Sequence, residues 1–209
     1  MVGRIIETEA CVAEGAAWLA AHDPRFAQAL AETGPLPLRR NQGGFATLLD
    51  AIVGQQVSVA SADAIMRRLE AAELVRADAI LAASDTDLRA CGLSRQKVAY
   101  ARALAEARLD FAALATLPDE AVLDRLIAIK GIGRWTAEIY AMFALGRADV
   151  LCAGDLALQE AARLLFGLGA RPTDKDLRAM AAAWSPWRGV AARLLWAYYR
   201  VAKRREGIR

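Results

Sequence analysis

The sequence is poor in the residues that build most metal and nucleophilic sites. It contains one His and three Cys in 209 residues, and Cys11, Cys91 and Cys152 lie far apart with no CxxC pair. This spacing excludes a four-cysteine iron–sulfur cluster, a zinc ribbon and a disulfide framework. A Ser-His-Asp or Cys-His mechanism would depend on His22 alone, and we interpret His22 as a surface residue.

Long apolar segments are also missing. No run approaches about 18 uninterrupted apolar residues, the length that a transmembrane helix needs, and the N-terminal stretch MVGRIIETEA lacks a signal-peptide core. We therefore expect a soluble cytoplasmic protein with no membrane partner. A net charge of +3 permits nucleic acid as a partner without requiring it.

Alanine, by contrast, is abundant along the whole chain. Alanine is the best helix former and a poor strand residue. The composition therefore predicts an all-α fold and nearly rules out an extended sheet. At this length the chain can bury a core without disulfides or metals, as one domain or as one domain of two lobes.

Apolar periodicity and capping residues predict helices almost throughout. The clearest break is GPLPLRRNQGG (residues 34–44), which we interpret as a loop between lobes. A sharp hairpin is expected at residues 130–133. The expected helices cover residues 9–21, 23–32, 45–54, 58–74, 77–83, 85–91, 94–108, 118–128, 134–145, 154–167, 173–184 and 186–205.

The hairpin lies in LIAIKGIGRWTAEIYAMFALG (residues 126–146). Gly131 and Gly133 allow a tight turn and expose backbone N–H groups at the start of the second helix. Such a nest binds phosphate without contacting bases, and Ile132 between the glycines is expected to insert into the core. By itself, the pattern fits a plain helix–helix turn equally well.

The surrounding sequence resembles the helix-hairpin-helix (HhH-GPD) DNA glycosylase superfamily, most closely its 3-methyladenine-DNA glycosylase II (AlkA-type) branch. The matching segments occur in family order and span most of the chain. They are FATLLDAIVGQQVSVASADAI (45–65), CGLSRQKVAYARALA (91–105), LIAIKGIGRWTAEIYAMFALGRADVLCAGDLALQ (126–159) and WSPWRGVAARLLW (184–196).

The resemblance implies a two-lobed, all-α fold with the active-site cleft between the lobes. We expect residues 44–147 to form a bundle that carries the hairpin, and residues 1–43 with 148–209 to form the second lobe. Only 44 residues precede Phe45 and they look helical, so the chain resembles a compact form without the β-rich N-terminal domain of several relatives.

The resemblance also implies that Asp155, in the sequence AGDL, is the catalytic carboxylate. The alternative interpretation is a helix cap, because Asp is a favoured capping residue. A lone carboxylate suits base excision, since it stabilises an oxocarbenium-like sugar and orients or deprotonates the attacking water. An alkylated purine already carries positive charge and departs without a general acid.

One position indicates the reaction type. Family members that also cut the DNA strand carry a nucleophilic lysine two residues after the second glycine, where this chain has Trp135. Lys130 precedes the first glycine and cannot substitute for it. The resemblance therefore implies a monofunctional enzyme that leaves an abasic site with no Schiff base. The missing cysteine cluster also argues against the endonuclease III and adenine-glycosylase branches.

A flipped base needs an aromatic receptor, and tryptophan faces favour a cationic alkylated base. The pocket positions implied by the resemblance are Trp135, Trp196, Ile139 and Tyr140. Ile139 stands where the family often has tyrosine, whereas Tyr140 lies on a different helical face. Trp184 and Trp187 are interpreted as core residues.

The remaining DNA contacts also come from the resemblance. Gln55 and Gln56 match the loop that fills the gap left by the flipped nucleotide; a polar helix joint is the alternative. The hairpin residues implied to bind phosphate are Gly131, Ile132, Gly133, Arg134 and Thr136. The backbone carbonyls of Ile127, Ile129 and Ile132 match those that often hold Na⁺ or K⁺, and no other cofactor is expected. Isolated charges that could contact phosphate or simply be solvated are Arg95, Lys97 and Arg188.

The leading hypothesis is a monomeric DNA glycosylase that removes 3-methyladenine or 7-methylguanine from double-stranded DNA in base-excision repair. One alternative is a non-catalytic damage-binding module that uses the same hairpin. Another is a glycosylase for hypoxanthine, ethenoadenine or uracil.

Overall fold

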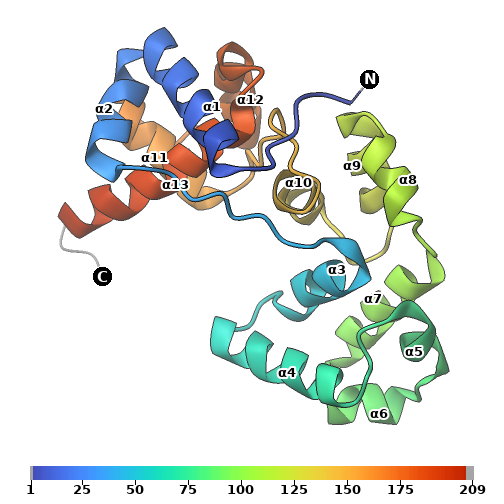
Figure 1. The fold of residues 1–209 in the computed structure, drawn as a ribbon. Helices are drawn as coiled ribbons and strands as arrows, with labels where there is room; N and C mark the ends of the chain where they lie inside the picture. The colour runs from blue at the N-terminus through green and yellow to red at the C-terminus, as the bar shows by residue number, and fades with distance from the viewer. Residues whose placement is uncertain (1, 206–209) are drawn as a thin grey trace. The chain divides into compact units, whose positions relative to one another are not determined.

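The computed structural model describes residues 2–205, and these residues confirm the predicted all-α fold (Figure 1). Extended pairing in the described chain is confined to one isolated bridge between Ile5 and Arg147. The helices are α1 (Glu9–His22), α2 (Pro24–Thr33), α3 (Gly44–Val53), α4 (Val59–Ala71), α5 (Ala77–Ala82), α6 (Asp85–Ala90), α7 (Arg95–Glu106), α8 (Phe111–Thr116), α9 (Asp119–Ile127), α10 (Arg134–Phe143), α11 (Leu156–Phe166), α12 (Asp174–Met180), the 3₁₀ helix η1 (Ala181–Trp184) and α13 (Arg188–Arg205). Within residues 2–205, no helix combines the length and apolarity needed to cross a membrane.

Capping side chains set many helix starts. Thr8, Asp23 and Thr173 each accept a hydrogen bond from a first-turn backbone N–H. The prediction missed α8, a six-residue helix capped by Asp110. It also extended several elements too far; for example, α12 tightens into η1 and α13 begins only at Arg188.

The chain divides into two compact units, and the boundary between them in sequence lies within α10, after Tyr140. The hairpin unit comprises residues 41–140, and the carboxylate unit comprises Gly3–Arg40 and the chain from Ala141 onward. The sequence had placed these boundaries after residues 43 and 147. In the hairpin unit α7 packs against α3, α5 and α6, over fully buried residues that include Leu48, Ile52 and Ile80.

In the carboxylate unit, α13 packs against α1, α2 and α11 (Figure 1). Gly15 of α1 allows a close approach, because a Cβ atom there would lie 2.6 Å from the Trp187 ring and 2.7 Å from Cγ2 of Val190 on α13. Phe26 contacts the Trp184 ring edge-on at 5.3 Å between centroids. Trp184 and Trp187 are buried, 5% and 3% exposed, which confirms them as core residues.

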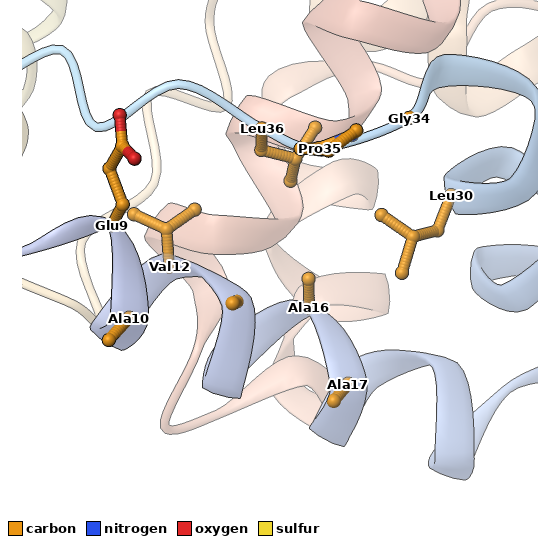
Figure 2. Close-up of a pocket in the computed structure, with 10 residues that line it drawn as sticks. Glu9, Ala10, Val12, Ala16, Ala17, Leu30, Gly34, Pro35 and Leu36 are labelled. Atoms are coloured by element: carbon orange, nitrogen blue, oxygen red, sulfur yellow. The ribbon is translucent and has the colours of Figure 1, made fainter.

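The carboxylate unit also contains an apolar pocket of about 600 Å³. Figure 2 shows Val12 and Ala16 pointing from α1 towards Pro35 and Leu36, with Leu30 entering from α2. None of the residues that line it was predicted to bind DNA or to act in catalysis, so the sequence assigns this pocket no part in the reaction.

Candidate active site

The hairpin joins α9 to α10 through a turn that only glycine fits. Gly131 has a φ of 97°, and a Cβ atom there would lie 2.3 Å from Cγ of Tyr100. The Ile132 N–H donates to the Ile129 carbonyl at 3.0 Å. Ile132 is only 4% exposed, so the prediction that it inserts into the core is confirmed.

The start of α10 follows Gly133 directly, so the positive end of the helix dipole lies at the hairpin. Arg134 is half exposed and donates to Glu138 at 2.9 Å. Thr136 is 6% exposed, so its side chain lies inside the unit. Backbone groups and Arg134, rather than the Thr136 hydroxyl, therefore form the surface that an anion would meet.

The hairpin carbonyls suit a monovalent cation chemically. The carbonyls of Ile127, Ile129 and Ile132 are neutral oxygen donors, and the Ile129 oxygen accepts one N–H and retains a second lone pair. Within the described part of the chain, no group of three or more His, Cys, Asp and Glu could hold a metal. The donor set therefore fits an alkali ion better than a transition metal.

Gln55 and Gln56, which the sequence placed together in one loop, differ in their surroundings. Residues 54–58 form this loop between α3 and α4, named here the insertion loop. Gln55 Nε2 donates to the Gly131 carbonyl at 2.9 Å. Gln56 is exposed and has a left-handed φ of 57°. Ser58 caps α4 by accepting from the Ser61 N–H at 3.2 Å.

The three isolated cations differ in availability. Lys97 is 9% exposed and its ammonium donates to the Val53 carbonyl at 2.6 Å, while burial lowers its pKa. The interpretation of Lys97 as a phosphate contact is therefore wrong, because its ammonium is buried inside the hairpin unit and bonded to a backbone carbonyl. Arg188 pairs with Asp149 at 2.7 Å, and Arg95 is exposed at the start of α7.

Asp155 caps α11 in the carboxylate unit. Its Oδ1 accepts from the backbone N–H groups of Ala157 at 2.9 Å and Leu158 at 3.0 Å. The indole N–H of Trp196 donates to the same oxygen at 3.2 Å. The interpretation of Asp155 as a helix cap is thus correct. A helix cap, however, does not explain the third hydrogen bond, which the Trp196 indole donates from α13.

Trp196 connects this carboxylate to a second aromatic ring and to a buried cation. Trp196 packs against Phe143 at 5.8 Å between centroids, and the guanidinium of Arg193 lies 4.7 Å from the Phe143 ring. Arg193 is 3% exposed. Burial, with repulsion from Arg39 and Arg40, lowers its pKa to about 10. Arg193 was not predicted from the sequence, because the residue pattern does not distinguish it from a surface arginine.

The other implied pocket residues lie on α10. Trp135 is 47% exposed in the first turn, and Ile139, one turn later, is half-buried. Tyr140 is 3% exposed, and its hydroxyl accepts from the Gly44 N–H at 2.9 Å. These contacts give Tyr140 a packing role within the hairpin unit, whereas the side chains of Trp135 and Ile139 keep accessible surface.

Two helices joined by a glycine turn, with a helix N-terminus open to an anion, are typical of the helix-hairpin-helix class of DNA-binding proteins. Residues 49–188 match the family described as "HhH-GPD superfamily base excision DNA repair protein", and the chain belongs to this family.

Individual relatives agree with this assignment. The chain is 31% identical to the DNA-3-methyladenine glycosylase 1 of Schizosaccharomyces pombe, over 78% of this chain and 75% of the relative. A DNA-3-methyladenine glycosidase of Bacillus halodurans superposes with a TM-score of 0.80 at 36% identity, covering 90% of this chain and 89% of the other. The S. pombe enzyme Mag1, solved with abasic DNA, superposes with a TM-score of 0.75 at 28% identity, covering 88% and 95%.

Proposed function

We propose that the protein is a monofunctional DNA glycosylase that hydrolyses the N-glycosidic bond of alkylated bases such as 3-methyladenine and 7-methylguanine. The observation that carries this proposal is Asp155, whose carboxylate is oriented by two backbone donors and one indole donor. The names of the relatives support the substrate class.

The chemistry follows from that carboxylate. As the base leaves, positive charge develops on the sugar, and a fixed anion stabilises this charge without reorganising. Asp155 also orients or deprotonates the water that attacks the anomeric carbon. Trp135 and Ile139 would contact the flipped base, with the Trp135 face favouring a cationic ring. A monovalent cation, held by the carbonyls of Ile127, Ile129 and Ile132, would neutralise phosphate charge at the hairpin.

Release of free base from damaged duplexes tests the function. We expect 3-methyladenine and 7-methylguanine to be released from methylated DNA, with strand breaks only after alkali. Borohydride should trap no protein–DNA adduct, because Trp135 stands where a lyase has its lysine. Duplexes that contain hypoxanthine, ethenoadenine or uracil define the lesion range. Salt-sensitive binding without any released base under single-turnover conditions would instead establish a damage-binding module.

Replacing Trp196 with Phe separates two roles of that residue. Phenylalanine keeps a ring for stacking but removes the N–H that donates to Asp155. We expect the single-turnover rate to fall by about tenfold or more, the loss expected for a hydrogen bond to a charged group. Trp18→Phe, in the same unit and stacked on His22, should leave the rate unchanged. A wild-type rate for Trp196→Phe would show that the hydrogen bond to Asp155 does not contribute to the rate and that Trp196 acts only by stacking.

A further inference from the structure

The insertion loop is held at two neighbouring points by side-chain hydrogen bonds. Lys97 of α7 donates to the carbonyl of Val53, the last residue of α3, at 2.6 Å. Two residues later, Gln55 Nε2 donates to the Gly131 carbonyl in the hairpin at 2.9 Å. The buried ammonium of Lys97 therefore holds the start of the loop, and the Gln55 hydrogen bond joins the loop to the turn predicted to bind DNA phosphate.

Packing alone does not support this loop. A pocket of about 250 Å³ is lined by Gln55, Gln56 and Val57 together with Lys97 and Tyr100 of α7. Because that space is not filled with side chains, the two side-chain hydrogen bonds help to hold the loop in place beside the pocket.

The hairpin end of the Gln55 bond is itself fixed. The Tyr100 ring occupies the space that a side chain at Gly131 would need. Tyr100 and Lys97 both belong to α7, so one helix supports the hairpin turn and the start of the insertion loop. A displacement of the hairpin backbone would therefore reach the loop through Gln55.

Gln56, the next residue, is placed differently. Its side chain is exposed and its φ is 57°, a conformation that L-residues keep only where their surroundings hold it. Val57 beside it is 40% exposed. Gln55 thus points to the protein backbone, while Gln56 projects from the loop.

We propose that Gln55 is a positioning residue that couples the hairpin's grip on DNA phosphate to the insertion of Gln56 into the duplex. This inference rests on the proposed function insofar as the loop enters DNA. Unstacking a base pair costs free energy, so the loop that carries the inserted side chain must keep its position while the duplex opens. The Gln55–Gly131 hydrogen bond supplies that support from the element that holds the backbone.

Base flipping, rather than excision, tests the coupling. The probe is a duplex with a tetrahydrofuran abasic-site analogue next to 2-aminopurine, whose fluorescence reports unstacking. Gln55→Met keeps the size and neutrality of the side chain but removes the donor. We expect the flipping equilibrium to fall by about tenfold, as one lost hydrogen bond allows, with affinity for undamaged duplex and melting temperature unchanged. Gln96→Met is the control, because Gln96 lines the same pocket but bonds the Tyr100 hydroxyl.

A double-mutant cycle identifies the partner of Gln55. If Gln55 acts through Gln56, Gln55→Met should add nothing to the loss caused by Gln56→Ala. An unchanged signal in Gln55→Met, a loss equal to that of Gln96→Met, or multiplicative losses in the double variant would overturn the proposal. The abasic analogue has no base to release, so a failure of the proposed glycosylase activity would be seen separately, on methylated DNA.

Discussion

Replacing Asp155 with Asn should reduce base release by at least about a hundredfold, because losing even one preorganised polar group from a transition state costs roughly that much. The amide carries no charge to stabilise the developing cation on the sugar and cannot accept a proton from water. Single-turnover release of 3-methyladenine from methylated DNA measures this effect.

The same substitution should leave the fold intact. The Oδ1 atom of asparagine can accept from the N–H groups of Ala157 and Leu158 as the carboxylate does, and Asn and Asp are nearly equivalent N-caps. Loss of the charge at the helix N-terminus should cost only about 0.5 kcal/mol of unfolding free energy. Affinity for an abasic-analogue duplex should stay within about threefold, a difference of less than about 0.7 kcal/mol.

Asp174→Asn provides a matched control. Asp174 opens α12 in the same unit, lies next to Gly154 and pairs with the part-exposed Arg178. The variant removes the same charge close in space, so it should release base at about the wild-type rate, since such surface pairs contribute little. Equal losses in the two variants would show that Asp155 acts only through net charge or stability.

Local signals explain why much of the fold was predictable from sequence. Thr8, Asp23 and Thr173 lie at helix starts because each cap depends on residues two or three positions away. The six-residue helix α8 has only Asp110 as a signal and is too short to show apolar periodicity. The equally short helices α5 and α6 were predicted, so length alone does not decide whether such an element is found.

The sequence points to candidate site residues only where a single residue carries the signal. Gly131, Ile132 and Asp155 stand out within short motifs. The bond from Gln55 to Gly131 spans 76 positions and that from Trp196 to Asp155 spans 41, and no local spacing encodes such pairs. Lys97 was misassigned because its partner is also distant in sequence. Nothing near Lys97 indicates that its ammonium is buried and bonded to the carbonyl of Val53 on α3.

Gly131→Ala should lower the free energy of unfolding by about 3 kcal/mol, from a strained backbone and an overpacked contact together. The φ of 97° is one that alanine rarely adopts, and the new methyl group would lie 2.3 Å from Cγ of Tyr100. Urea denaturation, with the m-value checked, measures the change. Because the turn must move, duplex affinity should also fall by about tenfold at fixed salt.

Gly133→Ala is the control for this prediction, since a Cβ atom there meets nothing within 4 Å. Alanine at such an unhindered position should leave stability unchanged or raise it by about 0.5 kcal/mol, through the unfolded chain. The difference between the two variants thus measures the backbone strain at Gly131 and its contact with Tyr100 together. If Gly131→Ala were as stable as Gly133→Ala, the Tyr100 ring would have to swing aside at little cost. The hairpin would then not be fixed on α7, and Gln55 would have no rigid backbone to bind.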